Sequence, residues 1–169
     1  MQCTNCGAQL ADDATVCASC GAQVASAPQP TGAPVPFEAF ELAPVPQGVR
    51  VNSLEPIDTP KGKRSAMYVS CSIPVEQAYE AASQILADNG YKPKPYDGQM
   101  VWKKGTGLAT AMHYVNVVPV QGHLYVQGWV MMGVGDATIM EQPLHGIVAA
   151  IPKSSTKKVV MKIKDACRA

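Results

Sequence analysis

Four cysteines near the N-terminus are the side chains of this chain best suited to chemistry. They form two pairs, Cys3 with Cys6 and Cys17 with Cys20, and ten residues separate the pairs. Two sulfur atoms at this short spacing can bind one ion when the backbone between them makes a tight turn. Two such turns supply the four ligands of a tetrahedral zinc ion. We therefore predict that Cys3, Cys6, Cys17 and Cys20 hold one structural Zn²⁺.

The predicted zinc site has no open coordination position. With four thiolate ligands the ion cannot bind the water that a catalytic zinc activates, so we expect a structural role. Gly7 and Gly21 follow the two pairs, and glycine can adopt the positive φ that such turns often need. Few apolar side chains accompany the cysteines, so we expect residues 1–24 to fold only with the metal.

The N-terminal segment also contains an internal repeat, Cys-Gly-Ala-Gln followed by Leu10 or Val24. With this repeat and its twin Cys-x-x-Cys-Gly motifs, the segment over residues 1–24 resembles the zinc-ribbon domain at the N-terminus of many bacterial proteins. The resemblance implies a module that docks proteins, binds nucleic acids or stabilises a neighbouring domain. The rest of the chain resembles uncharacterised bacterial zinc-ribbon proteins only loosely, through residues 104–108, Trp129 and residues 151–153, and this implies no activity.

Two alternatives to metal binding remain for the cysteines. Disulfides would suit an oxidising compartment, but the N-terminus has no basic region followed by an apolar run, so we expect a cytoplasmic protein with reduced thiols. A thioredoxin-like redox motif would need a β-α-β context that these pairs lack. The two remaining cysteines, Cys71 and Cys167, lie among apolar residues and are expected to be small buried side chains.

Proline content divides the chain into two parts. Eight of the fourteen prolines fall within residues 25–64, a composition typical of polyproline II and open coil. We predict a flexible linker over residues 25–64 and a globular domain over residues 65–169. Both phenylalanines, Phe37 and Phe40, lie inside the predicted linker. They indicate either a short docking motif or a strap that packs onto the second domain.

Hydrophobic periodicity in residues 65–169 predicts an α+β domain. A strand over 66–71 precedes a helix that begins after Pro74 and ends at Asn89 and Gly90, and a second helix carries the apolar stripe Val159, Val160, Ile163 and Cys167. Further strands are expected at 91–96, 100–103, 114–120, 124–132 and 138–141. The first of them contains prolines and should lie at a sheet edge, and residues 121–122 should form a hairpin turn. Residues 146–151 suit either a buried strand or a helical turn. This β-α-β-β-β-β-α-like order predicts an antiparallel sheet with helices on one face.

Catalytic signals are absent from the pattern of the sequence. In the predicted hairpin His113 and His123 would lie more than ~20 Å apart, so they cannot share a metal or a substrate, and His145 is a lone histidine beside apolar residues. The two Gly-x-Gly motifs, at Gly105 and Gly133, lack the third glycine of a dinucleotide-binding fingerprint. We predict that the protein is not an enzyme.

Charge leaves three functions open. The net charge is +1, but residues 61–64 carry +3 and residues 151–169 carry +5. The favoured interpretation is a zinc-ribbon adaptor that binds a protein partner and presents a second, partner- or ligand-binding domain. The second is nucleic-acid binding through Lys61, Lys63, Arg64 and the C-terminal helix. The third is an enzyme or small-ligand carrier with a concave sheet face under the helices. No apolar stretch approaches the ~20 residues of a membrane span.

Overall fold

The computed structural model describes residues 34–106, 111–131, 140–146 and 150–168. The chain divides into two compact units, Met1–Thr31 and Gly32–Ala169. The four cysteines predicted to bind zinc lie outside the described residues.

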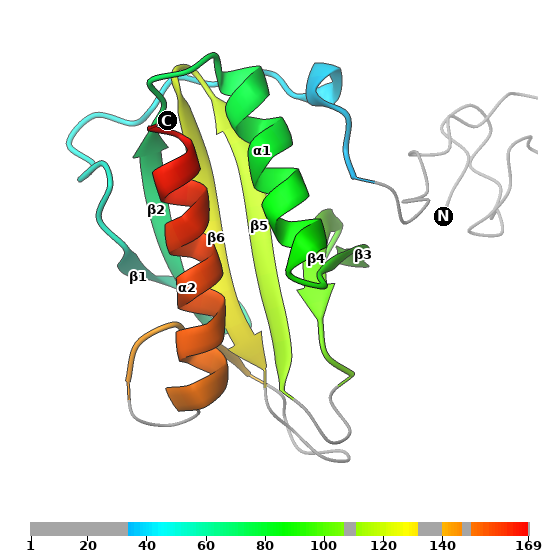
Figure 1. Cartoon of the computed structure of the whole chain (residues 1–169). Coiled ribbons are helices and arrows are strands. Elements are labelled where there is room, and N and C mark those ends of the chain that lie inside the picture. The colour runs from blue at the N-terminus through cyan, green and yellow to red at the C-terminus, as the bar shows by residue number, and fades with distance from the viewer. Residues whose placement is uncertain (1–33, 107–110, 132–139, 147–149, 169) are drawn as a thin grey trace, which may run out of the picture. The chain divides into compact units, whose positions relative to one another are not determined.

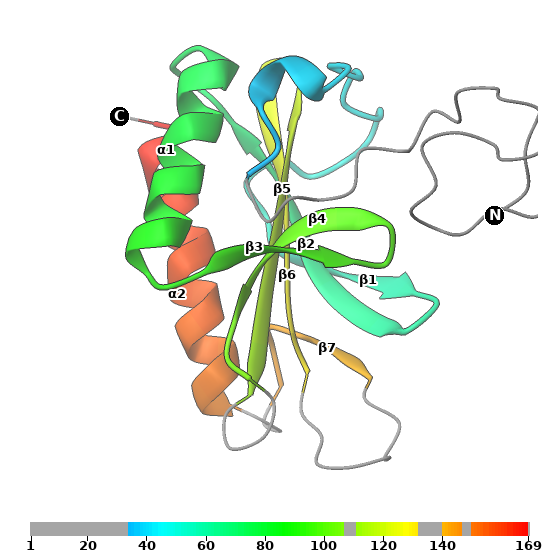
Figure 2. The same ribbon diagram turned by 90° about the vertical axis from the view of Figure 1, so that its right-hand side faces the viewer.

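The second unit is a seven-stranded, mostly antiparallel sheet with two helices on one of its faces (Figures 1 and 2). This arrangement confirms the predicted α+β class. The elements are β1 (Glu55–Thr59), β2 (Gly62–Ser70), α1 (Val75–Asp88), β3 (Lys92–Tyr96), β4 (Gln99–Lys104), β5 (Met112–Val120), β6 (His123–Met131), β7 (Glu141–Pro143) and α2 (Ala150–Ala166). A 3₁₀ turn over Phe37–Ala39 precedes them.

Local signals place both helices and strands β2 to β6 close to their predicted positions, whereas β1 was not predicted and β7 shares only Glu141 with the strand predicted over 138–141, most of which lies outside the described residues. Helix α1 begins directly after Pro74 and ends at Asp88, with Asn89 as its C-cap, and Gly90 then adopts a φ of +80°. The β5–β6 hairpin turns at Gln121 and Gly122, with Val120 opposite His123. Helix α2 begins at Ala150, at the end of the apolar run for which a strand or a helical turn was predicted.

The strand order is β1-β2-β7-β6-β5-β4-β3. β2 pairs directly with β6 from Ser65 to Ser70. Where these two strands separate, the short β7 lies between them, antiparallel to β6 and joined to β2 through the Gly62–Glu141 pair. This insertion brings Glu141 next to the start of β2.

The main core fills the space between the sheet and the two helices. The apolar stripes predicted on the helices are the buried ones: Ala78, Tyr79, Ala82 and Leu86 on α1, and Val159, Val160 and Ile163 on α2. They pack against sheet residues that include Val69, Val115, Val117, Leu124 and Val126. Because these side chains fill the space under the helices, the prediction that a concave ligand-binding surface lies there is wrong.

Residues 34–64, which the proline content assigned to the linker, belong to the second unit. β1 pairs with β2 over five residues, and Phe37 and Phe40 pack against Tyr79 with ring centroids 6.2 and 5.2 Å away. Of the two interpretations of these phenylalanines, the structure therefore shows the strap. Proline is compatible with this packing because Pro56 lies on an edge strand, where a missing N–H is tolerated.

Candidate functional site

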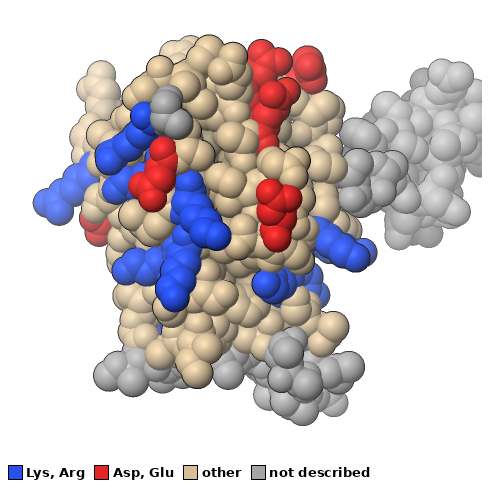
Figure 3. All heavy atoms as spheres, viewed as in Figure 1, with Lys and Arg blue, Asp and Glu red and all other residues tan. Residues whose placement is uncertain are grey.

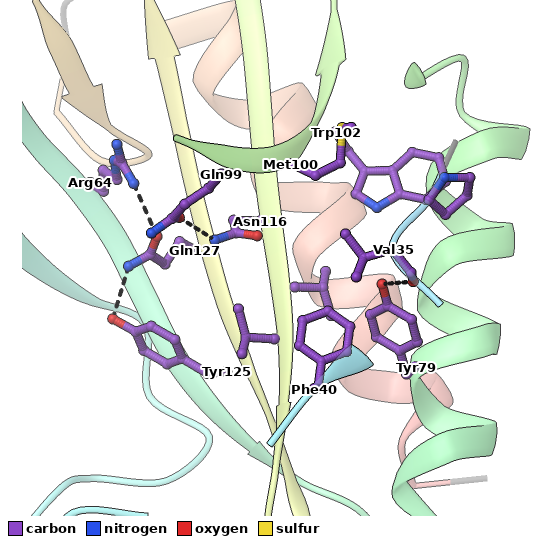
Figure 4. A pocket seen from close by; sticks show the side chains of 13 residues that line it. Val35, Phe40, Arg64, Tyr79, Gln99, Met100, Trp102, Asn116, Tyr125 and Gln127 are labelled. Atoms are coloured by element: carbon purple, nitrogen blue, oxygen red, sulfur yellow. Dashed lines mark hydrogen bonds between the residues drawn. The ribbon is translucent and has the colours of Figure 1, made fainter. Parts of the chain in front are cut away.

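The sheet face opposite the helices, here called the open face, carries a cleft of about 350 Å³. One wall is the strap, defined as residues 34–42, and the opposite wall is β4 (Figure 4). Side chains of β5 and β6 form the floor. In each of these strands alternate residues point to opposite faces, so the strands that bury valines under the helices also present polar groups here.

The floor of this open-face cleft is lined by uncharged amides. Asn116 and Gln127 are directly opposite each other in the β5–β6 pair. Asn116 Nδ2 donates a hydrogen bond to Gln99 Oε1 at 3.1 Å, and Gln127 Nε2 donates to the Tyr125 hydroxyl at 3.0 Å (Figure 4). A side-chain amide has two N–H donors and an oxygen with two lone pairs. Gln127 Oε1 also accepts a hydrogen bond from Arg64 Nη1 at 3.1 Å. Each amide still has hydrogen-bonding capacity beyond these contacts with which to bind a ligand.

Aromatic side chains form the walls of the cleft. Phe40 lies on the strap, Tyr79 reaches the cleft from α1 beside the strap, the buried Trp102 lies on β4, and Tyr125 rises from the floor. The Tyr125 ring lies 4.5 Å from the Tyr68 ring. A second, mostly apolar hollow of about 360 Å³ lies beyond this tyrosine pair, so the open face has two neighbouring depressions that share Tyr125.

A buried ion pair sits at the end of the cleft. Arg64 Nε and Nη2 donate to the two carboxylate oxygens of Glu141 at 2.7 and 2.6 Å. The hydroxyls of Thr59 and Tyr96 donate to the same carboxylate at 2.6 and 2.8 Å. The guanidinium of Arg64 also lies 3.9 Å from the centroid of Trp129, a stacking contact favoured by the ring quadrupole. Arg64 is thus neutralised and held rigid before any ligand arrives.

The same network explains the pKa of Glu141. Burial alone raises the pKa of this carboxyl, but the hydrogen bonds from Arg64, Thr59 and Tyr96 outweigh burial and hold the pKa below its ordinary value. Burial and the neighbouring Glu141 raise the pKa of Tyr96, and burial raises the pKa of Tyr79 to about 12. At neutral pH the carboxylate is therefore ionised, and both phenols are protonated.

The basic segment 61–64 was one of the predicted phosphate-binding elements, but its three cations form ion pairs with carboxylates of the fold. Lys61 lies 2.9 Å from Asp97, Lys63 lies 3.0 Å from Asp58, and Arg64 binds Glu141. On α2, Lys153 is buried and donates to the His145 carbonyl, while Lys164 donates to the Asn52 carbonyl. Much of the positive charge counted in the sequence is therefore engaged within the fold.

The histidines lie at three separate places. His113 Nδ1 is 2.7 Å from Thr156 Oγ1, and burial lowers its pKa. His123 contacts the Gln121 carbonyl at the hairpin turn, and His145 Nδ1 is 3.5 Å from the hydroxyl of the buried Ser65. Within the described residues, no group of three His, Cys, Asp or Glu side chains is arranged to hold a metal ion.

The two cysteines of the second unit are neighbours, which their separation in the sequence did not predict. The Ser72 amide donates to the Cys167 carbonyl at 2.8 Å. Cys167 is the main cause of a lowered pKa at Cys71, through a hydrogen bond between the two side chains. Cys167 is buried as predicted, whereas Cys71 is half-buried.

Sequence reasoning missed the residues of the open-face cleft. A signal existed, because Asn116 and Gln127 are amide residues within two mostly apolar strands. That signal alone does not identify a cleft, since any strand with one solvated face carries polar residues at alternate positions. The strap and β4 turn these polar positions into a hollow, and neither could be placed from the pattern of β5 and β6.

Comparison with known proteins identifies the N-terminal segment. Residues 2–24 match the zinc-ribbon domain family, which confirms the resemblance that the cysteine pairs indicated. No curated protein and no solved structure matches the chain. Zinc binding follows from this domain, and a set of four thiols fits the tetrahedral, sulfur-rich coordination that structural zinc prefers. Among the described residues, no helix is both long and apolar enough to cross a membrane.

Proposed function

We propose that this protein is a non-catalytic zinc-binding adaptor. Its ribbon holds one structural Zn²⁺ through Cys3, Cys6, Cys17 and Cys20 and binds a protein partner. Its second unit binds another partner through the open-face cleft. The observation that supports this proposal is the character of the cleft, which has amide side chains on its floor, aromatic walls and no nucleophile aligned with a base among its described lining residues.

An extended peptide is the ligand that this cleft suits best. Side-chain amides such as Asn116 and Gln127 can donate to backbone carbonyls and accept from backbone N–H groups. The partly exposed rings of Phe40 and Tyr125 can contact apolar side chains of the same peptide. The volume of about 350 Å³ falls within the range of ligand pockets.

A phosphate group fits the cleft poorly. Arg64 is the cation that lines it, and its guanidinium already donates two hydrogen bonds to Glu141 and a third to Gln127. An incoming phosphate would have to compete with a buried carboxylate for that charge. This supports a neutral ligand in the cleft over nucleic acid.

Affinity capture with the full-length chain tests the adaptor proposal. The Cys3→Ser/Cys6→Ser variant removes two zinc ligands, and Asn116→Leu blocks the cleft floor. Gln84→Leu, an exposed position on the outer side of α1, is the matched control for the added leucine. We expect the ribbon variant to lose one set of partners and Asn116→Leu to lose a different set, while Gln84→Leu retains both.

A peptide-display panel probes the cleft directly. Selected peptides should bind the wild type and Gln84→Leu equally, and should bind Asn116→Leu at least about tenfold more weakly, the cost of one buried polar contact left unpaired. In the affinity capture, identical partners for the wild type and the Cys3→Ser/Cys6→Ser variant would rule out docking by the ribbon. In the peptide panel, equal binding to the wild type, Gln84→Leu and Asn116→Leu would rule out the cleft as the peptide site.

A further inference from the structure

A third, chemically different hollow lies at the opposite edge of the sheet from β1. It has a volume of about 600 Å³ and is formed by β3, β4 and the turn after α1. Its lining includes Lys92, Lys94, Lys103 and Lys104, and no carboxylate is among its described lining residues. We name these four lysines and their surroundings the basic hollow.

The strand register forces these like charges together. Lys92 is directly opposite Lys103 in the β3–β4 pair, and Lys94 is two residues further along the same face. Like charges at directly opposite positions destabilise a sheet. Across the described parts of the chain, the cations that form ion pairs with carboxylates are Lys61, Lys63 and Arg64. The lysines of the basic hollow therefore repel one another without a carboxylate partner there to offset the repulsion.

Neighbouring contacts hold this charge in place. Lys103 Nζ lies 5.6 Å from the centroid of the Tyr114 ring, and Lys104 Nζ donates to the Asn89 carbonyl at 2.8 Å. Gly105 has a φ of +89°, and Thr106 lies at the rim. The hollow thus holds two lysines positioned by contacts within the fold beside two exposed lysines of β3.

Positive charge also extends from the basic hollow toward α2. Lys162 Nζ lies 3.4 Å from Asn89 Oδ1. The backbone carbonyl of Asn89 also accepts the hydrogen bond from Lys104, so both lysines contact this one residue. Figure 3 shows lysine and arginine side chains over α2 and again at the β3–β4 edge. Such an arrangement raises the local concentration of a diffusing anion.

We propose that the basic hollow binds a ligand with several adjacent phosphate groups, an oligophosphate. Lysine is a point charge with three rotatable donors, so a set of lysines suits several phosphate oxygens at varied angles. The aromatic rings beside the hollow, Tyr91 and Tyr114, are buried and present no free face for stacking a base. The phosphates of the ligand, and not a nucleobase, are therefore what the site recognises.

Titration of the full-length protein with tripolyphosphate tests this proposal by calorimetry. The Lys92→Gln/Lys103→Gln variant removes the opposed pair. The control Lys157→Gln/Lys158→Gln makes the same charge change at two exposed lysines of α2. We expect the first variant to weaken binding at least about tenfold and the control to weaken it by about threefold or less.

Thermal stability provides an independent reading of the same site. Without ligand, Lys92→Gln/Lys103→Gln should melt at or slightly above the wild-type temperature, because it relieves repulsion. Tripolyphosphate should raise the melting temperature of the wild type and the control, and should raise that of the Lys92→Gln/Lys103→Gln variant clearly less at the same ligand concentration. The proposal is overturned if tripolyphosphate does not bind, if both variants weaken it equally, or if a single-stranded oligonucleotide binds the same lysines more tightly than tripolyphosphate does.

Discussion

At the scale of single residues, Glu141 determines how the open face is organised. Its side chain is 0% exposed and accepts hydrogen bonds from three side chains, those of Thr59, Arg64 and Tyr96. A buried ion pair contributes little net stability compared with apolar residues, because both charges lose their hydration. Removal of one partner is costly, since the other charge is then buried alone.

We therefore predict that Glu141→Gln lowers the free energy of unfolding by about 3–5 kcal/mol, measured by urea denaturation. The control is Asp58→Asn, whose exposed ion pair with Lys63 should contribute less than about 1 kcal/mol. Similar losses for the two variants would contradict the role assigned to Glu141.

The same variant should also change the pH dependence of stability. The pKa of Glu141 is lowered in the folded state, so its stabilising contribution is present in full above the ordinary carboxyl pKa of 4.5 and is lost as pH falls through the folded value. Melting temperatures recorded from pH 7 down to pH 3 should converge for wild type and Glu141→Gln as acid removes this contribution. Parallel curves over that range would show that Glu141 does not titrate in this way.

At the scale of elements, the strap closes one side of the open-face cleft. The Tyr79 hydroxyl donates to the Val35 carbonyl at 2.7 Å, and the edge of Phe40 meets the Tyr79 ring. The Gln121 amide then donates to the Ala43 carbonyl at 3.0 Å, which attaches the chain to the β5–β6 hairpin. A segment with so few polar contacts depends on its two phenylalanines to stay in place.

We predict that Phe40→Ala loosens the strap without unfolding the sheet. The half-buried ring should contribute about 1–2 kcal/mol, less than a fully buried phenylalanine. Limited proteolysis followed by mass spectrometry should show faster cleavage between residues 41 and 50, and Val49→Ala, at a side chain already 36% exposed, is the control. Unchanged cleavage of Phe40→Ala would show that the strap is held by other contacts.

At the scale of the whole molecule, the chain has two compact units, and the described core of the second comes from residues beyond Phe37. Stability of that core should therefore not depend on the metal. For the zinc-ribbon segment, which has few apolar side chains, we expect the opposite dependence, because metal binding would supply its folding free energy.

We predict that zinc removal, by chelation or by Cys3→Ser/Cys6→Ser, leaves the melting temperature of the second unit within about 2 °C of its initial value, less than the shift expected for 1 kcal/mol. Scanning calorimetry of the full chain and a colorimetric assay of released zinc make the test. Glu141→Gln provides the converse control, since it should lower that melting temperature while zinc stays bound. A large loss of stability on chelation would mean that the two units fold together.

Several features could be predicted from the sequence because their causes are local. Pro74 and the pair Asn89 and Gly90 mark the ends of α1 through the conformations that these residues allow. The turn at Gln121 and Gly122 determines the register of β5 against β6. The Cys-x-x-Cys spacing identified the zinc-ribbon domain, which the family comparison confirms.

Other features arise only when distant segments meet, and only the tertiary structure decided them. Arg64 and Glu141 are 77 residues apart, and the short β7 joins them because it enters the gap between β2 and β6. The packing of the strap and the contact of Cys71 with Cys167 likewise depend on which surfaces are left free once the sheet has formed. The facing of Lys92 and Lys103 differs, because the two-residue turn at Asp97 and Gly98 sets the β3–β4 register locally. The sequence alone therefore identified the zinc-ribbon domain and determined the types of most elements, since periodicity and turn chemistry act over a few residues. The position of the cleft and the pairing of the charges followed from long-range packing, which no local pattern encodes.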